Sequence, residues 1–149
     1  MTSNISEDAA RLRLSVARLA RHLRAIDADA ALTPSQASLL STVVRKGRLG
    51  LSELAEIEGV DAPTLSRAVG RLEDKGLVRR KRDPKDGRAV TVEPSAAGRK
   101  LLQRLREARN DVLCGRLREL DAGERRLLHA ALPVLEALAD AVKQERVRA

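Results

Sequence analysis

The sequence predicts a mainly α-helical, single-domain protein that carries one small β-hairpin. Apolar residues recur at helical spacing along most of the 149 residues, and several segments open with a helix-capping residue. The hairpin is predicted because Val90 and Val92 alternate with Thr91 and Glu93, directly after the turn-forming sequence DPKDGR. The length suits one domain with a core of its own.

The composition favours a protein that binds a polyanion. The chain carries 29 Lys and Arg against 21 Asp and Glu, and between Arg67 and Arg88 nine cations stand against four anions. This balance indicates nucleic acid or another anionic surface as the partner. Phe, Tyr and Trp are absent, so the stacking contacts of most single-strand binders are missing. Duplex DNA, which is read through phosphates and groove edges, is therefore favoured.

The sequence gives little support for a membrane protein, a secreted protein or an enzyme. The longest apolar runs span only a few residues, and the N-terminus lacks the order of a secretory signal, so we expect no membrane segment. A single cysteine suits a reducing cytosol, and we expect a cytoplasmic, nucleoid-associated protein. No Ser-His-Asp, Cys-His or phosphate-loop constellation occurs. We therefore expect no catalytic activity, no cofactor and no metal.

The first predicted helix, residues 6–26, carries an apolar stripe at heptad period. The stripe consists of Leu12, Val16, Leu19, Leu23 and Ile26. The last helices of the chain carry a similar stripe, so we expect the two ends to form a dimerisation module. A second helix begins at Thr33 as N-cap, with Pro34 in the first turn and Gln36 placed for a capping box.

A helix-turn-helix is predicted next. Ser52 is interpreted as the N-cap of a short helix whose inward residues are Leu54, Ala55 and Ile57. Gly59 and Val60 form the turn, and Asp61 caps the following helix. The buried face of that helix consists of Leu65, Ala68, Val69 and Leu72.

The outward face of this last helix suits the major groove of DNA. Thr64, Arg67 and Arg71 lie on it at spacings i, i+3 and i+7, and Ala62, Pro63 and Ser66 lie at or near its N-terminal tip. A solvated arginine face is the plain alternative. The basic hairpin that follows directly favours a nucleic-acid surface.

The hairpin is predicted from strands at residues 77–82 and 89–93. The run RRKR at residues 79–82 adds general attraction to phosphates, although charge on an edge strand also deters aggregation. Arg88 beside the turn suits a narrow minor groove, and Asp86 is placed to hold its guanidinium. Ser95 and the capping box Asp121–Glu124 then open two long helices.

The complete order of elements resembles the MarR family of bacterial winged-helix transcription regulators. The match is clearest over residues 51–102. Ser66-Arg67, Leu72-Glu73-Asp74-Lys75-Gly76-Leu77 and Asp86-Gly87-Arg88 resemble the family's Ser-Arg recognition helix, Leu-x-x-Lys-Gly-Leu exit and Asp-x-Arg wing. One departure is Pro94-Ser95, where the family often has Leu-Thr, although Ser can still cap the helix.

The resemblance implies a winged helix-turn-helix domain flanked by N- and C-terminal dimerisation helices. Residues 33–94 would form the DNA-binding lobe, and residues 6–26 and 95–144 the helical lobe of a single domain. An obligate homodimer would place two recognition helices in successive major grooves of a pseudo-palindromic operator, with half-sites ~10 bp apart. The predicted DNA-binding residues are Ala62, Pro63, Thr64, Ser66, Arg67, Arg71, Arg79, Lys85, Asp86 and Arg88.

The resemblance also implies a small anionic or phenolic effector. On position and charge, Arg18, Arg21 and His22 of the first helix would meet it. Family members that sense oxidants place a cysteine in the first helix near tyrosines, whereas Cys114 lies in the fifth helix and the chain has no tyrosine. We interpret Cys114 as a small core or interface residue, and with Arg116 and Arg118 nearby a thiolate role stays open.

We therefore predict a sequence-specific, double-stranded DNA-binding transcriptional regulator that acts as a homodimeric repressor and is released by an effector. The alternative is a nonspecific architectural DNA-binding protein of the nucleoid type, which would use the same basic hairpin without reading bases. The operator, the sign of regulation and the identity of an effector stay open at this point.

Overall fold

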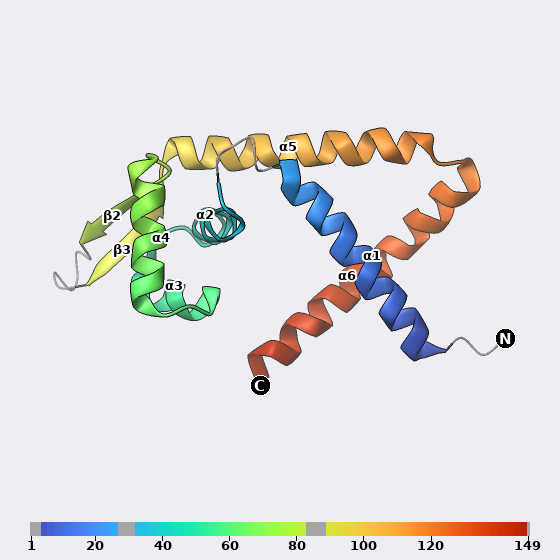
Figure 1. Cartoon of the computed structure of the whole chain (residues 1–149), viewed down its shortest axis with the longest axis horizontal. Helices are drawn as coiled ribbons and strands as arrows, with labels where there is room; N and C mark the ends of the chain where they lie inside the picture. The colour runs from blue at the N-terminus through green and yellow to red at the C-terminus, as the bar shows by residue number, and fades with distance from the viewer. Residues whose placement is uncertain (1–3, 27–31, 83–88, 149) are drawn as a thin grey trace. The chain divides into compact units, whose positions relative to one another are not determined.

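The computed structural model describes residues 4–26, 32–82 and 89–148. The helices are α1 (Ile5–Ala25), α2 (Pro34–Lys46), α3 (Leu51–Glu58), α4 (Ala62–Asp74), α5 (Ala96–Glu119) and α6 (Ala122–Arg148) (Figure 1). The strands are β1 (Leu49–Gly50), β2 (Val78–Arg82) and β3 (Val90–Pro94). The predicted fold class, mainly α with a small β-wing, is confirmed. The chain divides into two compact units, Met1–Arg109 and Asn110–Ala149, with the boundary inside α5.

Side-chain caps open most of the predicted helices. At α2, Thr33 Oγ1 accepts from Gln36 N at 3.2 Å and Gln36 Oε1 accepts from Thr33 N at 3.0 Å, which completes the predicted capping box. Asp121 and Glu124 make the same reciprocal pair at α6. Ser95 Oγ accepts from Gly98 N at 2.9 Å at the start of α5. These bonds satisfy backbone donors that a helix start otherwise leaves open.

The predicted cap at Ser52 is wrong. The helix α3 begins at Leu51 with Gly50 as its N-cap, and no side chain caps it. The reason is a third strand that the sequence pattern did not indicate. Leu49 pairs with Val92 and Gly50 with Thr91, so the chain is held extended until the helix begins.

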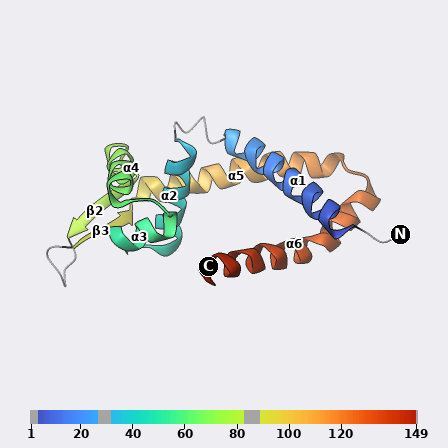
Figure 2. The same cartoon turned by 60° about the horizontal axis from the view of Figure 1, so that its bottom comes forward.

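The sheet has the order β1-β3-β2, and both pairings are antiparallel. The register of the hairpin places Arg79 opposite Glu93 and Arg80 opposite Val92. Since successive side chains of a strand point to opposite faces, Arg80 shares a face with Val78 and Arg79 does not. In both views β2 and β3 lie beside α4 (Figure 1, Figure 2).

The core of the first unit holds α4 in place. The core side chains with almost no exposure are Leu39, Leu40, Val43, Leu54, Leu65, Val69, Leu72, Val78 and Val92. Fully burying one such side chain contributes about 1.5–3 kcal/mol, so the three from α4 alone anchor that helix firmly. Ile57 was predicted to point inward, but it is 40% exposed. It lies within one turn of the helix end at Gly59, where α3 leaves the core.

Candidate nucleic-acid interface

The outward face of α4 carries the predicted polar residues. Ala62, Pro63, Arg67 and Arg71 are exposed, and Thr64 and Ser66 are half-buried. This arrangement follows from the sequence, because Leu65, Val69 and Leu72 occupy the buried stripe at helical spacing. The structure therefore brings together the six residues that the sequence assigned to this helix.

The N-terminus of α4 is fixed by Asp61. Its Oδ1 accepts from Thr64 N at 2.7 Å and its Oδ2 accepts from Thr64 Oγ1 at 3.0 Å. Thr64 Oγ1 in turn accepts from Arg67 Nη2 at 3.2 Å. The bonds from Thr64, followed by the charge of Arg67, hold the pKa of Asp61 below its ordinary value. Asp61 is therefore ionised at neutral pH and orders the tip of the helix.

The basic run of β2 divides into cations with different surroundings. Arg80 is directed at α4, where its Nη2 donates to Ser66 O at 2.6 Å and its backbone N donates to Glu73 Oε1 at 3.1 Å. Lys81 forms an ion pair with Glu93, which also accepts from Arg48 Nη2 at 3.2 Å. Lys81 and then Arg48 hold the pKa of Glu93 below its ordinary value.

Arg79 differs from these neighbours. Its side chain is exposed, and within the described part of the chain it has no ion-pair partner. The attraction of the run RRKR to phosphates stays a prediction, and the structure shows that its four cations do not have the same surroundings. Arg80 and Lys81 form ion pairs with Glu73 and Glu93, so their charges are partly offset, whereas Arg79 has no such partner among the described residues.

Three predicted residues, Lys85, Asp86 and Arg88, lie outside the described residues. The three predicted effector contacts, Arg18, Arg21 and His22, are exposed on α1, and none of them lines a described pocket. Cys114 is exposed, so the core interpretation of this residue is wrong for the single chain, and the interface interpretation stays a prediction.

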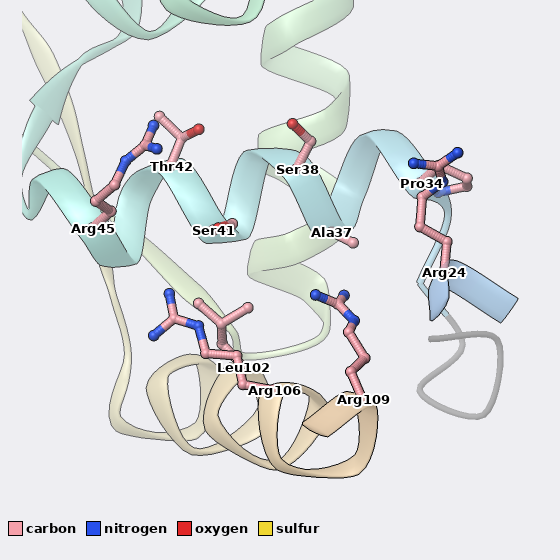
Figure 3. Close-up of a pocket in the computed structure, with 10 residues that line it drawn as sticks. All are labelled: Arg24, Pro34, Ala37, Ser38, Ser41, Thr42, Arg45, Leu102, Arg106 and Arg109. Atoms are coloured by element: carbon pink, nitrogen blue, oxygen red, sulfur yellow. The ribbon is translucent and has the colours of Figure 1, made fainter. Parts of the chain in front are cut away.

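A pocket of about 380 Å³, which we name the arginine pocket, lies between α2 and α5 and was not predicted. Its lining is Arg24, Pro34, Ala37, Ser38, Ser41, Thr42, Arg45, Leu102, Arg106 and Arg109 (Figure 3). The two helices face each other across it, with Arg106 and Arg109 rising from α5 toward α2. A signal existed in the sequence: Leu102, Arg106 and Arg109 recur at i, i+4 and i+7, which puts two arginines on an otherwise inward-facing stripe.

The described residues contain neither a candidate membrane span nor a candidate metal site. No helix there is long and apolar enough to cross a membrane. No group of three or more His, Cys, Asp or Glu side chains in that part of the chain could hold a metal ion.

The pair α3–α4 with its tight turn at Gly59, followed by the β2–β3 hairpin, is a winged helix-turn-helix. With the polar and basic face of α4 outward, the fold and this surface define the class of winged-helix DNA-binding proteins.

Comparison with known proteins specifies the family. The sequence model of the MarR family matches residues 32–90. The chain is 37% identical over 129 residues to the Uncharacterized HTH-type transcriptional regulator Mb0904 of Mycobacterium bovis, covering 87% of this chain and 90% of that relative. A crystal structure from Pseudomonas aeruginosa PA01 matches with a TM-score of 0.81 and 35% identity, over 93% of this chain and 98% of the other. A mutant of MepR from S. aureus, bound to an oligodeoxyribonucleotide, shares the fold with a TM-score of 0.70 and 20% identity, over 87% and 96% of the two chains.

The chain belongs to the MarR family of winged-helix regulators. It is thus a DNA-binding, HTH-type transcriptional regulator.

Proposed function

We propose that the protein binds a pseudo-palindromic duplex operator as a homodimer and represses transcription there. The observation that carries this proposal is the outward face of α4. Three buried side chains fix the helix, its first turn is ordered by Asp61, and Arg67 and Arg71 stand exposed beside a basic wing. A rigid polar face of this kind suits direct contact with base edges in a major groove.

The apolar surface of the helical ends supports a homodimer. No residue of α1 is buried, and Leu12, Val16 and Leu19 of its predicted stripe are exposed. On α6, Leu127 is 75% and Val134 is 60% exposed. Apolar patches of this extent mark an interaction site in most soluble proteins. A second copy of the chain would cover them and supply the second recognition helix.

The roles of the parts of the domain follow from this dimer. Residues 33–94 would contact DNA, and residues 6–26 and 95–144 would hold the two copies together. In the wing, Arg79 would contact a phosphate, and Lys85, Asp86 and Arg88 would form the minor-groove contact. A chromosomal operator would place the protein at the nucleoid in the cytoplasm.

The test of operator binding is selection of bound sequences from a random duplex pool. We expect a pseudo-palindrome whose half-site centres lie ~10 bp apart. Arg67→Ala should then cost about 1–3 kcal/mol of operator binding and relax the preference at one position of each half-site. A selected pool without any common sequence would favour the alternative, a nonspecific architectural DNA-binding protein.

The arginine pocket supports release by an anionic effector. Arg24, Arg45 and Arg106 line it together with the apolar Pro34, Ala37 and Leu102. Within the described residues these three arginines have no carboxylate partner. A ligand that carries a carboxylate on an apolar ring could bind the arginines through the carboxylate and pack its ring against the apolar residues.

Benzoate is a simple probe of this pocket. We expect calorimetry to detect benzoate binding to the wild type, and Arg106→Gln to weaken it at least about tenfold by removing a charge-assisted bond. Arg104→Gln is the matched control, since Arg104 is exposed on the same helix and does not line the pocket. Equal weakening in both variants, or no binding to the wild type, would count against the effector proposal.

A further inference from the structure

One face of α4 is neither the buried stripe nor the outward basic face. It consists of Ser66, Gly70 and Glu73, which lie at i, i+4 and i+7 and so share one side of the helix. Arg67 and Arg71 lie on a different side. In both views the strand β2 runs beside α4 (Figure 1, Figure 2), and Ser66 and Glu73 contact a side chain of that strand.

That side chain is Arg80. Its Nη2 donates to Ser66 O at 2.6 Å, and its backbone N donates to Glu73 Oε1 at 3.1 Å. A carbonyl oxygen has two lone pairs, so Ser66 O can accept this bond in addition to the bond that closes a helical turn. Arg80 therefore holds the backbone of α4 at one end of this face and a side chain of α4 at the other end.

Gly70 leaves room for the guanidinium between these two contacts. A Cβ at this position would lie 3.7 Å from Arg80 Nη2, which is the nearest atom to it. A methyl group would therefore fit, but a longer side chain would extend into the space that the guanidinium occupies. The absence of a side chain at Gly70 lets an arginine of β2 reach the backbone in the middle of the helix.

Stability alone does not account for this arrangement. Arg80 Nε is buried and has no hydrogen-bond partner among the described residues, since Glu73 Oε2 lies 3.7 Å away. A buried donor without a hydrogen bond costs stability, and such groups are rare in folded proteins. Departures of this kind from the most stable arrangement occur mainly at functional positions. The observation points to a role for Arg80 besides stabilising the fold.

The position of the contact indicates what that role is. The buried stripe holds α4 from one side, and the Arg80 contact holds it from a side about 100° further around the helix axis. Contacts from two sides fix the rotation of the helix about its axis, and hence the directions of Arg67 and Arg71. Reading of base edges depends on these directions, whereas attraction to phosphates does not.

We propose that Arg80 is a positioning residue for operator recognition. From β2 it fixes the orientation of α4, and it thereby determines how strongly the protein distinguishes its operator from other duplexes, without contacting a base itself. The inference rests on the proposed sequence-specific binding of duplex DNA.

Arg80→Lys tests this role, because it keeps the charge and the apolar stem of the side chain. A single ammonium does not reproduce the planar fork of donors of a guanidinium. Since the charge is kept, the Kd for a scrambled duplex should stay within about twofold of the wild-type value, whereas the Kd for the selected operator should rise at least about tenfold. A merely structural role would lower the melting temperature and leave the ratio of the two Kd values unchanged.

Arg79→Lys is the matched control. It is the same substitution one residue earlier in β2, at an exposed side chain that has no ion-pair partner among the described residues. Its ratio of Kd values should equal that of the wild type. An unchanged ratio in Arg80→Lys, or an equal fall in both variants, would overturn the inference. An Arg80→Lys protein that no longer folds would also overturn it, because Arg80 would then have a structural role.

A measurement without DNA separates this inference from the proposed function. Residual dipolar couplings of backbone amides report the direction of α4 relative to β3. One common alignment should describe both elements in the wild type, and the couplings of α4 should shrink relative to those of β3 in Arg80→Lys, because the helix direction is averaged. Unchanged couplings would overturn the inference. A wild type that binds operator and scrambled duplex equally would contradict the proposed function, and the couplings would still decide whether Arg80 orients α4.

Discussion

The guanidinium Nη2 of Arg80 lies 2.6 Å from the carbonyl oxygen of Ser66. The same Nη2 is 3.4 Å from Ser66 Oγ, and Arg80 Nε lies 3.7 Å from Glu73 Oε2. Since Ser66 and Glu73 stand seven residues apart on α4, one side chain of β2 spans about two turns of the recognition helix. Arg80 thereby ties the strand β2 to α4 at two points.

Replacing the head group of Arg80 should loosen this contact. We expect Arg80→Met, which keeps the apolar stem, to lower the free energy of unfolding by about 1–2 kcal/mol, since charge-assisted hydrogen bonds are lost. Urea denaturation measures this change. The control is Arg79→Met, whose exposed side chain should alter stability by less than about 0.5 kcal/mol while making the salt dependence of DNA binding shallower. The reverse pattern would contradict the assignment of the two arginines.

Gly98 should be the least replaceable glycine of the first unit. A Cβ at this position would overlap the carbonyl oxygen of Leu77 and lie 3.2 Å from Leu40 Cδ1. Backbone cannot move aside as a side chain can, so Gly98→Ala should destabilise by about 1–3 kcal/mol or more. Gly70→Ala, where the nearest atom would be Arg80 Nη2 at 3.7 Å, should instead stabilise by about 0.5–1 kcal/mol. Melting temperatures that move in the same direction for both variants would refute this description of the packing.

A charge in the apolar surface of α6 should dissociate the proposed dimer without unfolding the proposed DNA-binding lobe. Leu138 is 45% exposed in the single chain, so Leu138→Glu costs little there but would bury a charge in the proposed interface. Sedimentation equilibrium should show a monomer with unchanged helical content. His129→Glu also adds a negative charge on α6, away from the apolar stripe, and should stay dimeric. A dimeric Leu138→Glu protein would remove α6 from the interface.

The cap at Asp61 predicts a pH dependence. Bonds from Thr64 and the charge of Arg67 lower the pKa of Asp61 in the folded state. A lowered folded pKa means that the carboxylate stabilises the fold above its unfolded pKa, and that this contribution is lost as the pH falls through the folded value. Asp61→Asn keeps a capping oxygen without a titrating group. Its urea midpoint should therefore fall less steeply than that of the wild type between about pH 5 and pH 2. Parallel curves would contradict this role of the ionised cap.

Local chemistry explains why most of the fold could be predicted. Thr33, Asp61 and Asp121 mark the starts of their helices because a capping residue acts within three positions of itself. The stripe Leu65, Val69, Leu72 likewise fixes the outward face of α4, so Arg67 and Arg71 were placed correctly.

The features that the sequence did not reveal depend on contacts between distant segments. The strand β1 is two residues long and is defined by its pairing with Val92 and Thr91. It is too short to show the alternation of apolar and polar residues that predicts a strand. Arg80 is one of four cations in a row, and only the packing of β2 against α4 distinguishes it from Arg79. The arginine pocket forms where α2 meets α5, and the spacing of Leu102, Arg106 and Arg109 indicates one face of α5 but not the helix that lies opposite.

The most direct test compares the Kd for the selected operator with the Kd for a scrambled duplex of the same length at one salt concentration. A dimer that reads bases through α4 should bind the operator on the order of 10³-fold more tightly, or better. A ratio near one would contradict sequence-specific regulation and leave a protein that holds DNA through its phosphates alone.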